Sequence, residues 1–123
     1  MHKARQTSFP RSLRVAEEIQ RILGDVFLTR VKIAGAGLLT VTRVSINRDL
    51  RVAQVYISLL RPDKSPEEVL TDIIHHGKEI RYLLGKVLEL KYVPELRFHL
   101  DHSTKKAAKI NLLLENLHPS DLK

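Results

Sequence analysis

Apolar residues recur at helical spacing in the first part of the chain that shows any periodicity. Between residues 11 and 27 they fall three and four positions apart, which gathers them on one side of a helix. The apolar positions are Leu13, Val15, Ala16, Ile19, Ile22, Leu23, Val26 and Phe27. Residues 1–10 are polar and basic, lack periodicity and end at Pro10. We therefore predict a flexible basic tail over residues 1–10, followed by a helix of about four turns from Arg11.

Two segments with the composition of β-strands follow this helix. Gly35 and Gly37 mark a loop, and residues 39–47 and 52–59 are then rich in Val, Thr, Ile and Leu. An Asn-Arg-Asp sequence between the two segments is typical of a turn, so the pair predicts a hairpin. In the second segment apolar residues alternate with polar ones, which predicts one buried face and one wetter face.

The next helix has a well-marked start at Ser65. Glu68 three residues later completes a capping box, and Pro66 occupies the first helical position, where its missing N–H costs nothing. Apolar residues then recur at helical spacing as far as the next break in the pattern. They are Val69, Leu70, Ile73, Ile74, Ile80, Leu83, Leu84, Val87 and Leu88. Gly77 lies midway, so we predict two helices joined at Gly77.

Residues 95–101 alternate between apolar and polar types and predict a third strand. Ser103 then begins a last predicted helix, with apolar positions at Ile110, Leu113, Leu114 and Leu117. Three strands with helices on one face satisfy the layer rule for a single core. The order of elements is the second (type II) topology of the KH domain. We predict an α+β, KH-like RNA-binding domain over residues 11–102, with a C-terminal helix and short tail over residues 103–123 packed on it.

The charge of the chain indicates a class of partner. The chain has 21 Lys and Arg against 14 Asp and Glu, a formal net charge of +7. Such a surplus attracts nucleic acid, because each neutralised phosphate releases counterions. A membrane partner is not expected, since no segment has the roughly 18 apolar residues of a span or a strongly amphipathic basic helix. The chain has no cysteine and no secretion signal at its start, so we expect a cytoplasmic protein without disulfides.

The junction of the two middle helices is the first candidate site. KH domains hold single-stranded RNA near such a junction, where a Gly-X-X-Gly loop lets phosphates approach backbone N–H groups. This chain has no such loop, but it has His76 and Gly77 at the junction, with Lys78 and Arg81 on one face of the following helix. The first fourteen residues contain no acid, so their cations Lys3, Arg5, Arg11 and Arg14 are further candidate RNA contacts. Arg43, which is expected on the open face of the sheet, is the last candidate.

Catalysis, metal binding and cofactors are not expected. His75 and His76 are adjacent, about 100° apart on a helix, and do not form the i, i+4 pair that shares one metal. Asp101, His102 and Ser103 are consecutive at a strand end and cannot converge as a Ser-His-Asp relay. Nucleophile elbows, Walker loops and HExxH motifs are missing. Aromatic residues make up 5% of the chain and lack the pattern of a stacking platform, so base stacking is not expected to drive affinity.

Blocks of sequence spaced along residues 11–117 resemble those of one known family. The blocks are Arg11-Ser12-Leu13-Arg14-Val15, Val41-Thr42-Arg43-Val44, Asp49-Leu50, Ala53-Gln54-Val55-Tyr56-Ile57-Ser58, Ile80-Arg81-Tyr82-Leu83-Leu84-Gly85, Val93-Pro94-Glu95-Leu96 with Phe98, and Asp101-His102-Ser103. Together they resemble ribosome-binding factor A, a family with the KH order in which an Ala-x-Gly kink replaces the Gly-X-X-Gly loop. His75 stands at the position of the kink alanine, whereas Gly77 is retained.

The resemblance implies a bacterial assembly factor that binds the small (30S) ribosomal subunit late in its maturation, near the decoding region. It also implies assistance with 5′-end processing of 16S rRNA, a link to growth in the cold and release by a ribosome-associated GTPase. We expect a monomer. Two alternatives remain open, namely a KH-type binder of single-stranded mRNA or small RNA, and a protein–protein interaction module that uses the exposed sheet face.

Overall fold

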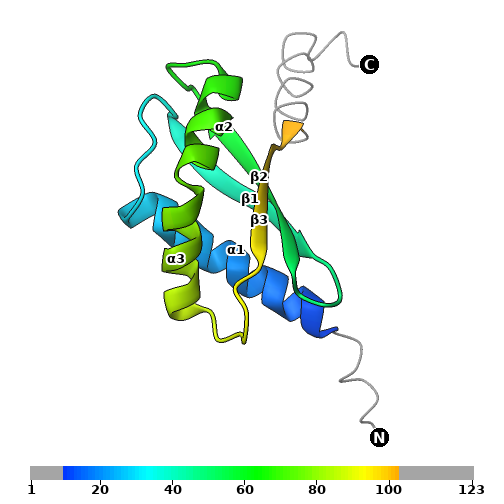
Figure 1. The fold of residues 1–123 in the computed structure, drawn as a ribbon. Coiled ribbons are helices and arrows are strands. Elements are labelled where there is room, and N and C mark those ends of the chain that lie inside the picture. Colours follow the sequence, from blue (N-terminus) through cyan, green and yellow to red (C-terminus); the bar gives the residue numbers. More distant parts are fainter. Residues whose placement is uncertain (1–9, 103–123) are drawn as a thin grey trace, which may run out of the picture.

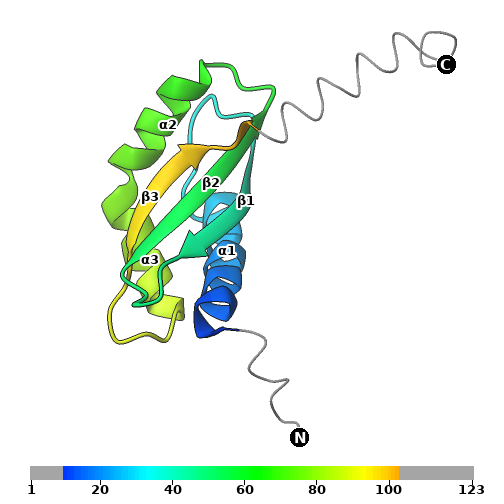
Figure 2. The same ribbon diagram turned by 90° about the vertical axis from the view of Figure 1, so that its right-hand side faces the viewer.

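The computed structural model describes residues 10–102, which form two layers (Figure 1). The elements are α1 (Arg11–Thr29), β1 (Leu38–Ile46), β2 (Val52–Leu60), α2 (Pro66–His75), α3 (Gly77–Val87) and β3 (Glu95–Leu100). The three helices cover one face of the three-stranded sheet (Figure 2), so the predicted α+β order and layering are confirmed. Most of the predicted basic tail, including Lys3 and Arg5, and the predicted C-terminal helix lie outside the described residues.

β2 is the central strand of the sheet. It pairs antiparallel with β1 through the hairpin and parallel with β3, which returns by way of α2 and α3. A bulge at Thr42 shifts the register of β1 between Val41 and Arg43. At this bulge the side-chain amide of Gln20 on α1 donates hydrogen bonds to the carbonyl oxygens of Val41 and Thr42, each at 3.2 Å. The first helix is therefore tied to an outer strand by polar as well as apolar contacts.

A hydrophobic core fills the space between the helices and the sheet. Its fully buried side chains include Ile19, Leu23, Val55, Ile57, Val69, Ile73, Ile80 and Leu84. Each such side chain stabilises the fold by about 1.5–3 kcal/mol relative to an exposed position. Leu13, Ile74 and Val87, which were predicted to belong to the apolar stripes, are exposed instead. A helix can turn only part of a wide apolar stripe toward one sheet. Each of these residues lies at the margin of the stripe on its own helix.

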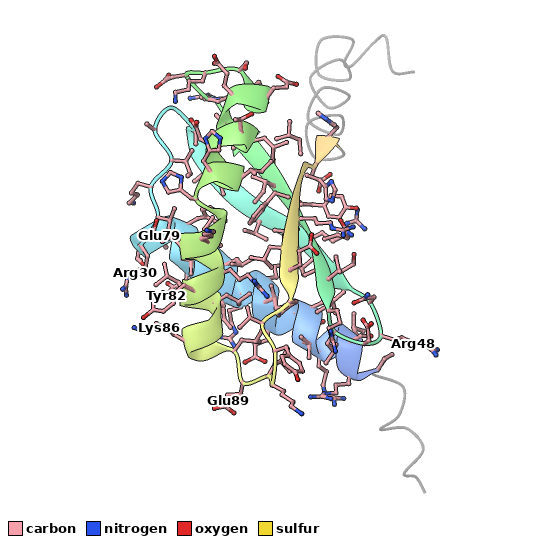
Figure 3. The ribbon with its side chains drawn as sticks, in the orientation of Figure 1. Arg30, Arg48, Glu79, Tyr82, Lys86 and Glu89 are labelled. Atoms are coloured by element: carbon pink, nitrogen blue, oxygen red, sulfur yellow. The ribbon has the colours of Figure 1, made fainter. Side chains whose placement is uncertain are left out.

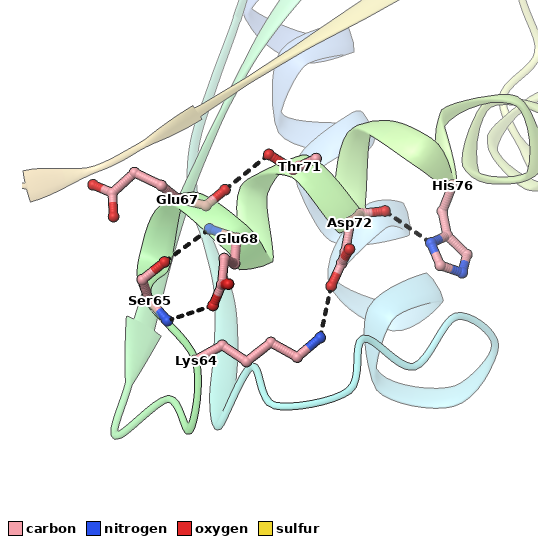
Figure 4. Close-up of polar contacts among 7 residues, drawn as sticks. All are labelled: Lys64, Ser65, Glu67, Glu68, Thr71, Asp72 and His76. Atoms are coloured by element: carbon pink, nitrogen blue, oxygen red, sulfur yellow. Dashed lines mark hydrogen bonds and ion pairs between the residues drawn. The ribbon is translucent and has the colours of Figure 1, made fainter.

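The start of α2 has the predicted capping box (Figure 4). The Ser65 hydroxyl accepts a hydrogen bond from the Glu68 backbone N–H at 3.1 Å, and the Glu68 carboxylate accepts one from the Ser65 N–H at 3.3 Å. Lys64, just before the cap, forms an ion pair with Asp72, about two turns further along α2, at 2.9 Å. This hydrogen bond with Lys64 lowers the pKa of the Asp72 carboxyl. The pair therefore stabilises the fold at neutral pH, and this contribution is lost as the pH falls through the lowered pKa.

Replacing Ser65 with alanine is expected to reduce the free energy of unfolding by about 1 kcal/mol, because the Glu68 N–H at the start of α2 loses its acceptor. Denaturant unfolding would measure the change. Ser65→Asp retains an acceptor at the cap and serves as the control, with stability close to that of the original protein. Equal stability of Ser65→Ala and Ser65→Asp would show that the cap contributes nothing.

The connection between α1 and β1 depends on two glycines. Gly35 and Gly37 both have positive φ, at +76° and +67°. The Gly35 carbonyl accepts a hydrogen bond from the Asp63 N–H at 2.8 Å, so this loop is attached to the one that leads into α2. A Cβ at Gly37 would lie 2.2 Å from the Leu60 carbonyl oxygen. Only glycine gives both the backbone conformation and the close approach that the loop needs.

Candidate nucleic-acid interface

The two middle helices are separated at His76, one residue before the glycine at which the break was predicted. His76 has φ −89° and ψ 9°, ends α2 and precedes the first residue of α3. Its ring Nδ1 lies 2.9 Å from the Asp72 carbonyl oxygen (Figure 4). Gly77 has no positive φ, so the bend does not use the conformational freedom of glycine. His75 is exposed, and its bulk at the kink alanine position therefore does not obstruct packing.

Gly77→Ala is expected to leave the free energy of unfolding unchanged or to raise it by up to about 1 kcal/mol. A Cβ at this position would meet nothing within 4 Å, and alanine favours a helix over glycine. Thermal unfolding of the variant would test this expectation. A marked loss of stability would mean that the junction needs glycine after all. If the stability is unchanged but RNA binding is weaker, the role of Gly77 is to let the RNA approach the backbone closely.

Arg81 connects α3 to the segment that leads into β3. Its guanidinium donates to the Val93 carbonyl at 2.6 Å and to the Pro94 carbonyl at 3.1 Å. Two of its five N–H donors are therefore engaged within the protein, and the side chain holds residues 91–94 against the helix. Lys78, one turn earlier on α3, is exposed. The two predicted contacts are thus neighbours as expected, but Arg81 has a structural role that its sequence context did not reveal.

A cleft of about 440 Å³ lies where this segment meets α3. We call it the α3 cleft. Its lining residues are Lys78, Arg81, Tyr82, Lys91, Tyr92 and Val93. Three of the six are cationic, none is acidic, and two are tyrosines with 65% (Tyr82) and 57% (Tyr92) of their surface exposed. The α3 cleft therefore combines positive charge with accessible aromatic surface.

Each tyrosine of the α3 cleft has a cation close to its ring. Lys86 Nζ lies 5.4 Å from the ring centroid of Tyr82, and both side chains point outward from α3 (Figure 3). The Arg51 guanidinium carbon lies 5.1 Å from the centroid of Tyr92, and Lys91 Nζ lies 5.6 Å from it. These distances approach the outer limit of about 6 Å for cation–π attraction. The contacts add further positive charge around the cleft.

The predictions from sequence missed both tyrosines and Lys91. Tyr82 and Tyr92 are ten residues apart on different elements, and only the packing of residues 91–94 on α3 brings them to one cleft. Local patterns do not encode this proximity. A usable signal existed in the helix itself, since Tyr82 falls off the apolar stripe and has a lysine four residues later.

Arg43 lies on the opposite layer, on the open face of the sheet as predicted. Its guanidinium carbon is 4.0 Å from the ring centroid of Tyr56, and that ring stacks on His99 at 5.0 Å. The three residues are paired in register across the three strands, and His99 also forms a short hydrogen bond with Gln54. Because this face points away from the helices (Figure 2), Arg43 is not brought together with the α3 cleft.

Arg11 and Arg14 occupy the first turn of α1 and are exposed. This end of α1 lies at the same end of the molecule as the segment between α3 and β3 (Figures 1 and 2). The predicted RNA contacts within residues 10–102 therefore fall into three groups, at the helix junction, at the start of α1 and on the open sheet face.

The described part of the chain has neither a cluster of metal-ligating side chains nor a helix suited to a membrane. Residues 10–102 contain no group of three or more His, Cys, Asp or Glu side chains that could hold a metal ion. None of their helices is both long and apolar enough to cross a membrane.

Glu95 is the first residue of β3 and directly follows Pro94. Its carboxylate accepts a hydrogen bond from Arg97 at 3.0 Å, and this bond lowers the pKa of the Glu95 carboxyl. The charge of Arg81 makes a smaller contribution in the same direction.

The sheet order, the broken helix pair and the helices on one face together define a KH-like domain. The chain matches the model of the family Ribosome-binding factor A over residues 11–114 and belongs to that family. It is 36% identical over 107 residues to ribosome-binding factor A of Bdellovibrio bacteriovorus, covering 87% of this chain and 80% of the relative. It is 30% identical over 118 residues to that of Ectopseudomonas mendocina, covering 94% and 92%.

Solved structures agree with the fold. The crystal structure of ribosome-binding factor A from Thermus thermophilus superimposes with a TM-score of 0.64 at 19% identity, over 72% of this chain and 94% of that one. A homology model of the Thermus thermophilus factor, fitted into a cryo-EM map of its complex with the 30S subunit, gives a TM-score of 0.61 at 20% identity, over 72% and 92%. A Thermotoga maritima solution structure assigned to this family gives 0.58 at 29% identity, over 72% and 85%.

Proposed function

We propose that this protein binds the small ribosomal subunit and assists late maturation of 16S rRNA, including processing of its 5′ end. The observation that supports this most strongly is family membership over residues 11–114. The Thermus thermophilus factor of the same fold has been placed in a complex with the 30S subunit. In this proposal the protein acts by docking on RNA and carries out no covalent chemistry.

The charge distribution supports an RNA partner. The net charge is +7, and the α3 cleft has three cationic and no acidic lining residues. Each phosphate that a lysine or arginine neutralises adds sequence-independent affinity through counterion release. Arg11 and Arg14 at the start of α1 add two further exposed cations. We place the rRNA contact on the helix layer, with the α3 cleft at its centre.

The proposal has further parts that follow from the family alone. We propose a cytoplasmic monomer that acts near the decoding region, supports growth in the cold and is released by a ribosome-associated GTPase.

Sedimentation of cell extract through a sucrose gradient tests the main proposal. The protein is expected to travel with free small subunits and to be scarce in polysomes, because a factor that acts during assembly leaves before translation. Depletion of the protein is expected to increase 16S rRNA with an extended 5′ end. A protein that stays at the top of the gradient, together with normal rRNA ends after depletion, would contradict the proposal.

A further inference from the structure

We infer that the α3 cleft is a binding site for one unpaired nucleotide of RNA, whose base lies against Tyr82 or Tyr92 and whose phosphate lies near Lys78 and Lys91. The inference rests on the proposed function in taking RNA as the partner. It goes beyond that function by naming single-stranded RNA and base stacking as the mode of recognition.

The α3 cleft is shallow and open to solvent. Its volume of about 440 Å³ is nevertheless within the range of about 300–1,000 Å³ found for small-molecule pockets. A duplex would present phosphates and groove edges to this surface, whereas its base faces are covered by stacking within the helix. Only an unpaired base can offer a flat face to a tyrosine ring.

The exposed tyrosines are the feature that phosphate binding alone leaves unexplained. Tyr82 and Tyr92 have more than half of their surface in contact with solvent. Both flank the same cleft. Bases stack on such rings in proteins that bind single strands, and this stacking tolerates sequence variation because every base has a flat face.

The surrounding cations would serve the same nucleotide. Lys86 and Lys91 lie 5.4 and 5.6 Å from the ring centroids of Tyr82 and Tyr92, distances at which the attraction is weak. A base with a larger contact area can displace them from the rings, and they can then approach its phosphate. Lys78 and the donors of Arg81 that the protein leaves free complete a positive wall.

An acidic protein segment is the competing occupant. Carboxylates would satisfy the cations, but they would not use the two tyrosine faces, which are the accessible apolar surface of the cleft. The combination of ring faces and cations therefore favours a nucleotide, which supplies a flat base and an anion in one unit.

Intrinsic fluorescence provides a direct test, because the chain has three tyrosines and no tryptophan. Tyr56 lies on the open sheet face between Arg43 and His99. In a Tyr56→Phe background, only Tyr82 and Tyr92 would emit. The probe is an unstructured pentauridylate, compared with an abasic ribose-phosphate chain of the same length and charge.

Pentauridylate is expected to quench the emission and to bind about tenfold more tightly than the abasic chain, since stacking adds to the phosphate attraction. Equal affinity for the two probes, or no binding of either, would overturn the inference. Because the two probes carry the same charge, a purely electrostatic interaction would not separate them.

Two double variants complete the test. Tyr82→Leu with Tyr92→Leu keeps apolar bulk and removes the rings, and it is expected to lose the preference for pentauridylate. Tyr82→Phe with Tyr92→Phe keeps the rings, and in binding measured by competition against a labelled oligonucleotide it is expected to retain the preference. Retention by the leucine variant would overturn the inference. Circular dichroism would show that both variants are folded.

Binding of the same variants to purified small subunits separates this inference from the proposed function. Weaker binding of the leucine variant alone would support both. Normal binding of all variants would leave the proposed function intact and overturn the inference. Loss of binding with a crosslink from the cleft to a ribosomal protein would identify a protein surface instead and would also overturn it. If the original protein does not bind subunits, the proposed function fails, and the oligonucleotide result decides the inference.

Discussion

Gly37→Ala is expected to lower the free energy of unfolding by about 3 kcal/mol, one of the two largest effects that we predict. Alanine would have to adopt the positive φ of +67°, a conformation that costs roughly 1–2 kcal/mol for a residue with a Cβ. That Cβ would also lie 2.2 Å from the Leu60 carbonyl and 2.6 Å from the Arg61 carbonyl. Both obstacles are backbone atoms, so the loop before β1 would have to move away from the end of β2.

Gly24→Ala is the matched control for this change. Gly24 lies inside α1, and a Cβ there would meet nothing within 4 Å. Alanine is therefore expected to stabilise the helix by up to about 1 kcal/mol. Denaturant unfolding of both variants would measure the difference, with an unchanged slope showing that the denatured state is comparable. Similar stability of the two variants would refute the argument from the Gly37 backbone.

Lys78→Ala combined with Lys91→Ala is expected to weaken binding to small subunits by about tenfold to a hundredfold. Each lysine that contacts a phosphate contributes a charge-assisted interaction of about 1.5–3 kcal/mol when well placed, and exposure reduces this value. The slope of log affinity against log salt is expected to fall by roughly 0.7–1, since the two lysines neutralise one phosphate and that contact is lost. Filter binding at several salt concentrations would measure both quantities.

The control for this variant removes the same net charge elsewhere. Arg48 lies at the tip of the β1–β2 hairpin (Figure 3), and Lys32 lies in the loop after α1, where its Nζ donates to the Leu28 carbonyl. Arg48→Ala with Lys32→Ala is expected to change affinity far less. Arg81 is kept in both variants because it holds residues 91–94 in place. Equal losses for the two variants would mean that total charge, and not the α3 cleft, determines affinity.

The elements of the fold follow from local sequence signals. Ser65, Pro66 and Glu68 marked the start of α2 because capping involves residues within one turn. Gly35 and Gly37 marked the loop before β1 because positive φ is a property of single residues. The break between α2 and α3 was placed one residue late, at Gly77, since a glycine in a helical pattern is only an indirect sign of a bend. His76 ends α2 through its own backbone and ring contacts with Asp72.

The site was predicted only in part, because its geometry depends on contacts between distant segments. Lys78 and Arg81 could be placed on one face of a helix from their spacing alone. The carbonyl partners of Arg81 come from residues 93 and 94, and no local pattern indicates that contact. The prediction that stacking does not drive affinity relied on the lack of a local aromatic motif and is not tested by the structure. Tyr82 and Tyr92 line one cleft only in the folded chain, so the sequence could not suggest the alternative inferred above. RNA contact by each of the predicted site residues stays a prediction, and Lys3, Arg5 and residues 103–123 also lie outside the described residues.

The hydrogen bonds from Gln20 to β1 also have a consequence for behaviour at high concentration. An outer strand with unpaired carbonyl groups is a template on which a second molecule can add a strand, and this is a common route to aggregation. Gln20 occupies the Val41 and Thr42 carbonyls, and the bulge at Thr42 disturbs the regular spacing that an incoming strand would need. One helical side chain thereby helps to keep neighbouring molecules from joining their sheets.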